Sequence, residues 1–232
     1  MMLSLADWEI VRLSLKVSLA AVIITLPFAF ALAWLLARGR FPGKLLLDAA
    51  VHLPLVLPPV VIGWLLLLAL GPAGPVGALL DRWLGVSVMF RWTGAAVASA
   101  IMALPLMVRA MRLSIESVDR RVEDAARTLG ASPGRCFLTI TLPLSLPGVV
   151  TAFILGFARS IGEFGATITF VSNIPGETQT LSLAIYSALQ VPGSDATVWR
   201  LALISVALSL GALVASEALS QRQRAGRSGH VL

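Results

Sequence analysis

Arg159 and Glu163 are opposite charges that stand four residues apart in an otherwise apolar segment, GFARSIGEFGATITF at 156–170. This spacing places both side chains on one face of a helix. A charge at the middle of a membrane costs at least about 2.5–3.5 kcal/mol, so it faces protein or water. The pair is either a structural ion pair that orients the helix, which we favour, or part of an anion pathway or gate. Ser160 and Thr167 add hydroxyl groups to this candidate pathway.

Catalytic, cofactor-binding and metal-binding residues are not expected. His52 and His230 lie far apart without partners at ligand spacing, and the one cysteine, Cys136, excludes an internal disulfide. Asp48 precedes His52 by four residues, but a packing role beside the nearby prolines is favoured over a proton relay. The sequence contains no G-x-x-x-x-G-K-[ST] phosphate loop. We therefore expect no membrane-embedded enzyme and no ATPase site in this chain.

A second polar segment, RRVEDAARTLGASPGRCFLTITLP at 120–143, carries six charged residues between apolar stretches. Its apolar residues recur at helical spacing and form a narrow stripe, with charged residues on the other faces. The stripe comprises Val118, Val122, Ala125, Ala126 and Leu129, and the charged faces comprise Arg120, Arg121, Glu123, Asp124 and Arg127. Gly130 is placed to end this helix in the left-handed conformation, and Ser132 to cap a second helix from Pro133.

The composition identifies the elements that must position these residues as membrane helices. The chain has 232 residues, of which 57% are hydrophobic and 13% charged, whereas a soluble domain is about 25% charged. We predict an all-α integral membrane protein with one domain over 1–232 and spans near 17–37, 45–70, 93–108, 147–171 and 201–219. Pro54, Pro58 and Pro59 predict a bent or broken second span. Short outer helices are expected within 71–92 and 180–190.

The basic residues indicate which side of the membrane each connection occupies. Twelve of them follow the first, third and fifth predicted spans: Arg38, Arg40, Lys44, Arg109, Arg112, Arg120, Arg121, Arg127, Arg135, Arg222, Arg224 and Arg227. The positive-inside rule puts these connections in the cytoplasm, so the N-terminus is expected outside and the C-terminus inside. The net charge of +6 is therefore explained by topology rather than by nucleic-acid binding. Acidic residues near the N-terminus argue against a cleaved signal peptide, so we expect a retained first span.

The segment 120–143 resembles the EAA loop of binding-protein-dependent ABC transporter permeases. The pattern is an acidic residue, two alanines, then glycine, isoleucine and leucine-proline at fixed spacings, met here by Asp124, Ala125, Ala126, Gly130, Ile140, Leu142 and Pro143. Asp124 replaces the usual glutamate and Glu123 precedes it, which leaves open which carboxylate contacts the partner.

The resemblance implies a type I ABC importer permease fold. Its cytoplasmic loop at 112–145 would carry a coupling helix that seats in a separate ATP-binding subunit. The implied coupling residues are Val118, Arg121, Val122, Glu123, Asp124, Ala125, Ala126, Arg127, Leu129 and Gly130.

Further segments narrow the resemblance to molybdate permeases. These are FPGKLLLDAAVHLPLVLPPVVIGWLLLLALG, EDAARTLGASP and SIGEFGATITFVSNIPGETQTLSLAIYSALQ, and the likeness extends from about Leu13 to Ser220. It implies a homodimer with two copies of an ATP-binding subunit, served by a periplasmic molybdate-binding protein. Sulfate and thiosulfate permeases share GEFGA and are the nearest alternative, with tungstate also possible as cargo; NIPGETQT favours molybdate. An anion channel that works without ATP is the alternative from another class.

Overall fold

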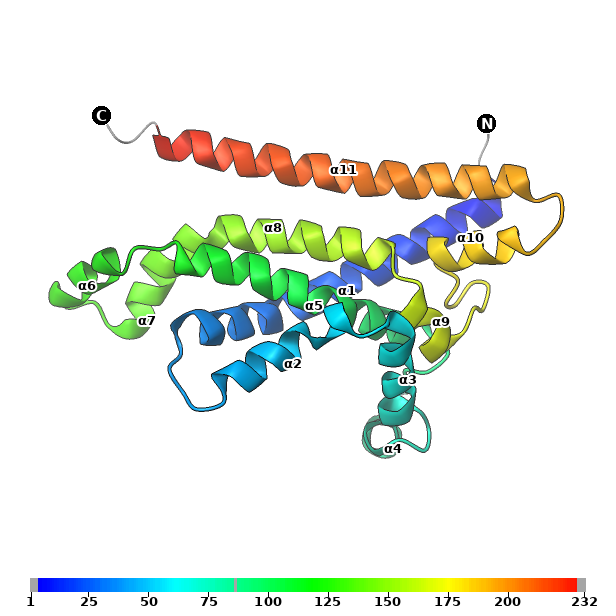
Figure 1. The fold of residues 1–232 in the computed structure, drawn as a ribbon, viewed down its shortest axis with the longest axis horizontal. Coiled ribbons are helices and arrows are strands. Elements are labelled where there is room, and N and C mark those ends of the chain that lie inside the picture. The colour runs from blue at the N-terminus through cyan, green and yellow to red at the C-terminus, as the bar shows by residue number, and fades with distance from the viewer. Residues whose placement is uncertain (1–3, 86, 229–232) are drawn as a thin grey trace.

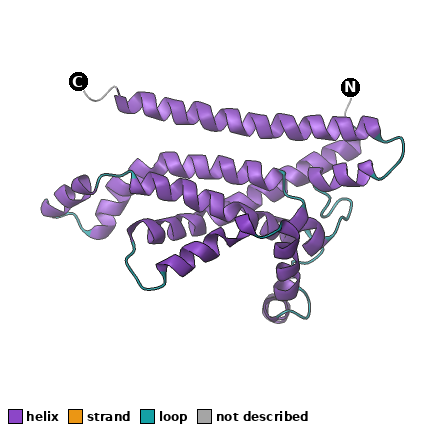
Figure 2. Cartoon of the chain, viewed as in Figure 1, coloured by secondary structure: helices purple, strands orange, loops and turns teal. Residues whose placement is uncertain are grey.

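Helices form every regular element in the residues that the computed structural model describes, 4–85 and 87–228 (Figures 1 and 2). Within these ranges, four helices are long and apolar enough to cross a membrane. They are α1 (Leu5–Arg38), α5 (Trp92–Glu116), the continuous helix Pro133–Ile161 and the segment Asp195–Ala215 of α11 (Asp195–Ser228). A fifth crossing results if α2 (Lys44–Val56) and α3 (Pro59–Leu70) count as one broken span. The expected all-α membrane fold is confirmed.

Helix α5 forms the centre of the bundle and packs against α1 and α8 (Leu142–Ile161). Its side chains Met107 and Met111 are fully buried. Small residues let the helices approach closely, as is usual in membrane bundles. A Cβ atom added at Gly148 of α8 would lie 2.2 Å from the Cβ atom of Ser114. The contact between α5 and α8 therefore depends on a residue without a side chain.

Helices α1, α5 and α11 are longer than the spans that the sequence predicts, and the first two illustrate the reason. Helix α1 begins at Leu5 rather than near residue 17, because Ser4 and Asp7 form a reciprocal capping box at its start. At 34 residues it measures about 51 Å, which exceeds a hydrocarbon core of about 30 Å. Helix α5 covers Trp92–Glu116 rather than 93–108. Apolar runs mark the part of a helix in lipid, whereas capping and protein contacts determine where the helix ends.

The second predicted span is broken at its prolines, as expected. Helix α2 ends at Val56, Leu57 is extended with ψ of 142°, and α3 begins at Pro59. A residue before proline is pushed out of the helical region, and the two helix axes differ by 115°. Helix α3 therefore projects from the bundle together with α4 (Pro75–Leu84), as Figure 1 shows.

The fourth predicted span, 147–171, is two helices rather than one. Helix α8 ends at Ile161, and α9 (Gly165–Val171) follows after a three-residue break. Helix α9 packs on α3, where a Cβ atom at Gly63 would lie 2.6 Å from the backbone oxygen of Ala166. The residues of the break include Glu163, whose side chain explains the interruption, as the next section describes.

The short helices predicted outside the spans are both present. Helix α4 begins at Pro75, and α10 (Leu181–Leu189) follows the turn after α9. Leu181 and Leu183 are fully buried, and the backbone N–H of Leu181 donates to Ser14 Oγ of α1 at 2.7 Å. Helix α10 is therefore part of the bundle at the end where α1 begins.

Candidate functional site

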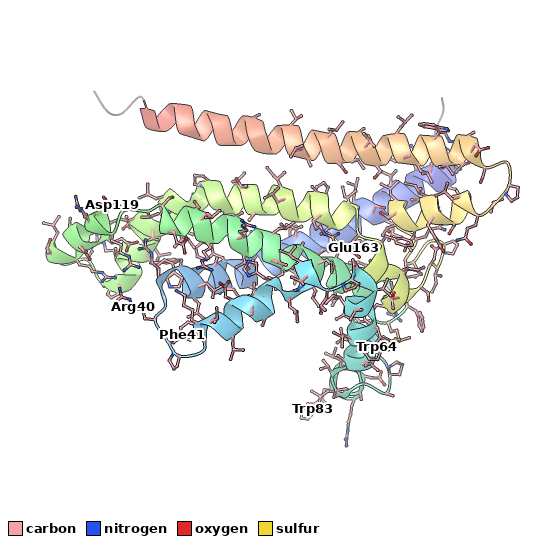
Figure 3. The ribbon with its side chains drawn as sticks, in the orientation of Figure 1. Arg40, Phe41, Trp64, Trp83, Asp119 and Glu163 are labelled. Atoms are coloured by element: carbon pink, nitrogen blue, oxygen red, sulfur yellow. The ribbon has the colours of Figure 1, made fainter. Side chains whose placement is uncertain are left out.

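The predicted coupling helix is α6 (Arg120–Thr128), which lies at the opposite end of the bundle from α10 (Figure 1). Its first turn is capped by the Asp119 carboxylate, which accepts from the backbone N–H of Arg121 at 2.9 Å. Figure 3 shows Asp119 at this end of the molecule. Gly130 follows the helix with φ of +88°, and Ala131 N–H donates to Ala126 O at 3.0 Å. The left-handed stop predicted at Gly130 is confirmed, and it ends α6 as a rigid projection.

The outward surface of α6 is partly apolar and partly charged. The side chains of Val122 and Leu129 are 47% and 90% exposed. Ala126 is half-buried, and the remaining outward residues are exposed: Arg121, Asp124, Ala125 and Arg127. Val118 is 5% exposed because it precedes the helix and faces the bundle, so it does not continue the predicted stripe. A partner surface would therefore meet Val122 and Leu129 with charged residues around them.

Glu123 faces the bundle instead of lying on the charged outer face assigned to it from the sequence. Its carboxylate Oε1 forms an ion pair with Arg38 Nη2 of α1 at 3.0 Å, with side chains 11% and 13% exposed respectively. The same oxygen accepts from Thr141 Oγ at 2.7 Å. We call these three residues the Arg38–Glu123–Thr141 cluster. It ties α6 both to the end of α1 and to the start of α8.

The Arg38 side chain also joins this cluster to the end of α5. Its Nη2 atom donates to the backbone oxygens of Ile115 and Val118, at 3.2 and 3.3 Å. Arg38 is 85 residues away from Glu123 in the sequence, so helical periodicity within 118–129 gave no signal for this contact. Asp124, by contrast, is exposed and forms no ion pair among the described residues. Of the two adjacent carboxylates, Asp124 is the one open to another protein.

The segment after Gly130 returns to the bundle through an irregular helix. Ser132 caps α7 (Pro133–Cys136), accepting from Arg135 N–H at 3.4 Å, and Pro133 occupies the first helical position as predicted. A π-helical turn, η1 (Phe137–Thr141), then leads into α8. Such turns are rare and occur often at functional sites. Thr141 at the end of η1 is the residue that reaches Glu123.

The intramembrane pair is formed as predicted: Arg159 Nη1 lies 2.7 Å from Glu163 Oε2. The Glu163 side chain is 2% exposed and that of Arg159 27%. The second oxygen, Oε1, accepts from the backbone N–H of Ala166 at 2.8 Å, so Glu163 caps the start of α9. This capping role supports the structural interpretation, because the pair fixes the turn between α8 and α9. Glu163 lies within the bundle near α9 in Figure 3.

The two hydroxyl residues assigned to the pathway are both buried. Ser160 is 4% exposed and Thr167 is 1% exposed. The Oγ atom of Ser160 forms no hydrogen bond among the described residues. No cavity described here contains either residue, so their part in a pathway stays a prediction. The described residues also contain no cluster that could hold a metal ion.

His52 belongs to a polar cluster that joins α2 to α5. Its Nδ1 atom lies 2.9 Å from Asp48 O and 3.2 Å from Asp48 Oδ1. The Asp48 carboxylate accepts from Arg112 Nη1 at 3.1 Å, and Arg112 Nε donates to Glu116 at 2.8 Å. The Asp48–Arg112 contact holds the bent helix α2 against α5, and His52 contacts Asp48 from within α2.

Known proteins with similar sequences define the class of this chain. The family model described as "Binding-protein-dependent transport system inner membrane component" matches residues 25–225. The chain therefore belongs to the family of binding-protein-dependent transport system inner membrane components.

More specific relatives are molybdenum permeases. The chain is 56% identical to the "Molybdenum transport system permease protein ModB" of Escherichia coli K12 over 229 residues, which cover 98% of this chain and 100% of that protein. It is also 56% identical to the ModB protein of Haemophilus influenzae, over 92% of this chain and 93% of that one. "Sulfate permease 2, chloroplastic" of Chlamydomonas reinhardtii is 40% identical over 86% of this chain and 55% of that protein. The resemblance to molybdate permeases seen in the sequence is confirmed.

Solved structures confirm the fold. A bacterial ABC transporter that imports alginate matches with a TM-score of 0.70 at 18% identity, over 96% of this chain and 80% of that chain. The MetNI methionine ABC transporter matches with a TM-score of 0.67 at 16% identity, over 94% of each chain. At these identities the likeness concerns the fold alone, and the type I ABC importer permease fold is the one expected from the EAA-like loop.

Proposed function

We propose that this chain is the membrane-spanning permease subunit of an ATP-driven importer that moves molybdate across the bacterial cytoplasmic membrane by alternating access. The observation that carries this proposal is the exposed helix α6, which Gly130 follows as a left-handed stop and which Glu123 ties to α1 through Arg38 and to the start of α8 through Thr141. The 56% identity to molybdenum transport permeases supports molybdate as the cargo.

The proposed partner of α6 is an ABC ATP-binding subunit, with two copies serving a homodimer of this chain. Val122 and Leu129 supply the apolar contact, and Asp124 with the exposed arginines sets its orientation. ATP and Mg²⁺ are bound by that partner, and this chain provides no catalytic, cofactor or metal site. Val60 and Trp64 on the projecting α3 are exposed apolar side chains, and they support contacts with a second copy or with lipid. Figure 3 labels Trp64 on this helix.

The proposed sidedness follows from the partner. Helix α6 lies in the cytoplasm, the N-terminus lies outside, and the C-terminus lies inside, in agreement with the basic residues of the connections. A periplasmic molybdate-binding protein then delivers cargo at the end where α1 begins.

The contacts of Glu123 provide a route by which movement of α6 would reach the membrane helices. When ATP binding closes the ATPase pair, each α6 is displaced as a rigid body. Glu123 passes this displacement to α1 through Arg38 and to α8 through Thr141, because both contacts are short and largely buried. The spans then open outward, and hydrolysis returns them. Arg159 and Glu163 hold α9 at the end of α8 during this change, and Ser160 and Thr167 are the candidate pathway residues beside them.

Reconstitution tests the proposal. The permease is purified with its ATP-binding subunit, placed in proteoliposomes and given the molybdate-loaded binding protein. We expect ATP-dependent uptake of radioactive molybdate that unlabelled molybdate suppresses and sulfate does not. Suppression by sulfate, thiosulfate or tungstate at lower concentration would instead assign that anion as cargo, an alternative that the sulfate permease relative supports. Flux without ATP and without an associated ATPase would favour the channel.

A further inference from the structure

A hollow of about 410 Å³ lies between the N-terminal part of α1 and the loop that joins α9 to α10. Its walls include Glu9, Arg12 and Lys16 from α1, and Pro175, Gly176 and Gln179 from the loop. The two segments that line the hollow lie at the end of the bundle where α1 begins and α10 lies. Figure 1 shows this end opposite α6. No residue of the predicted coupling helix or the Arg159–Glu163 pair contributes to the hollow.

Two positive charges of the hollow lack acidic partners. Arg12 and Lys16 stand four residues apart on one face of α1 and are exposed, and neither forms an ion pair within residues 4–85 and 87–228. The Lys16 ammonium lies 3.8 Å from the ring centroid of Trp92, which fixes its position without neutralising it. The nearby Asp7 is already paired with Arg200 at 3.4 Å.

The loop wall of the hollow is rigid although its tip is exposed. Thr178 is fully buried and joins two parts of the turn: its Oγ accepts from Ile174 N–H at 2.8 Å and donates to Ser172 O at 2.9 Å. Gly176 has φ of +80°, which allows the sharp turn beside exposed Pro175. A preformed tip loses little conformational entropy when a protein binds to it.

We propose that this hollow is a docking surface for the substrate-binding protein, and that Arg12 and Lys16 receive carboxylate side chains of that protein. The inference rests on the proposed function for the identity of the partner and for the side on which it docks. The volume falls in the range of sites for drug-sized ligands and is much larger than a single four-oxygen anion needs. Glu9 in the same wall opposes the capture of a free oxyanion, but it suits a protein surface of mixed charge.

The test uses the complete transporter in proteoliposomes of zwitterionic lipid and measures ATP hydrolysis against the concentration of molybdate-loaded binding protein. For the double variant Arg12→Glu/Lys16→Glu, the half-saturating concentration should rise about tenfold, the size expected from reversing two exposed ion-pairing charges. The maximal rate of ATP hydrolysis should stay unchanged, because only the affinity for the binding protein is altered. Glu9→Lys should lower the half-saturating concentration, and added salt should reduce the difference between the variants.

The inference is supported if the half-saturating concentration rises for Arg12→Glu/Lys16→Glu and falls for Glu9→Lys. General damage to α1 would instead weaken docking in both variants. If the complex assembles and the binding protein stimulates it equally in all variants, the docking assignment is wrong while the proposed function stands. If no ATP-binding subunit co-purifies, the proposed function itself fails. Should the variants differ only in vesicles that contain phosphatidylglycerol, the hollow binds lipid headgroups and the inference is overturned.

Discussion

Replacing Glu123 by glutamine should weaken the attachment of α6 to the bundle while leaving the outer surface of α6 unchanged. The substitution keeps the size of the side chain and removes its charge, so the ion pair with Arg38 at 3.0 Å is lost. Removing one partner of a fully buried pair costs about 3–5 kcal/mol. The loss here is smaller because Arg38 still donates to Ile115 O and Val118 O, and because the amide oxygen can still accept from Thr141.

We estimate that the free energy of local opening falls by about 2 kcal/mol, which is near the middle of the range for hydrogen bonds to charged groups. Since each 1.4 kcal/mol corresponds to a factor of ten, the local opening of residues 119–136 should become about 30-fold more frequent. Amide hydrogen exchange of this segment in the purified permease measures that opening directly. In the reconstituted transporter, the number of molybdate ions taken up per ATP hydrolysed should fall, because the ATPase would move a helix that is less firmly attached.

Asp124→Asn is the matched control, since it makes the same change of charge at the adjacent, exposed carboxylate. Its exchange rates in the isolated permease should equal those of the wild type, whereas its association with the ATP-binding subunit should weaken. The reasoning is refuted if Glu123→Gln exchanges at the wild-type rate and remains fully coupled. Equal loss of protection in both variants would also refute it, because the contact with Arg38 would then not be what holds α6.

Three further substitutions test other parts of the structure. Gly130→Val should uncouple ATP hydrolysis from uptake while membrane insertion remains intact, because φ of +88° strains a β-branched residue, whereas Gly134→Ala has free space and should transport normally. Arg159→Ala leaves the Glu163 carboxylate, which is 2% exposed, without its charged partner. Either the yield of monodisperse protein in gel filtration or the rate of uptake should therefore fall. Normal values of both would show that Arg159 has neither a structural nor a transport role. Gly148→Ala places a methyl group 2.2 Å from a side-chain carbon of α5 and should lower the unfolding temperature of the complex, and an unchanged temperature would show that α5 and α8 separate easily.

The sequence by itself determined the elements that depend on local chemistry. Apolar runs marked the membrane helices, since lipid leaves no other way to satisfy the backbone. Pro58 and Pro59 predicted the break between α2 and α3, and Gly130 with Ser132 predicted the stop and restart around the coupling loop. Each of these signals acts through a few neighbouring residues, so no knowledge of the rest of the fold was needed. The resemblance to the EAA loop rested on the same local pattern.

Only the tertiary structure decided which charged residues face inward. Periodicity put Glu123 and Asp124 together on a charged surface, but Glu123 is buried because Arg38 reaches it from another helix. In the same way, the spacing of Arg159 and Glu163 predicted their ion pair, yet only the packing of α9 on α3 showed that Glu163 ends one helix and caps the next. A helix places a side chain in a direction, and the neighbours met in that direction come from distant parts of the chain; the burial of a charge is therefore a property of the assembled bundle.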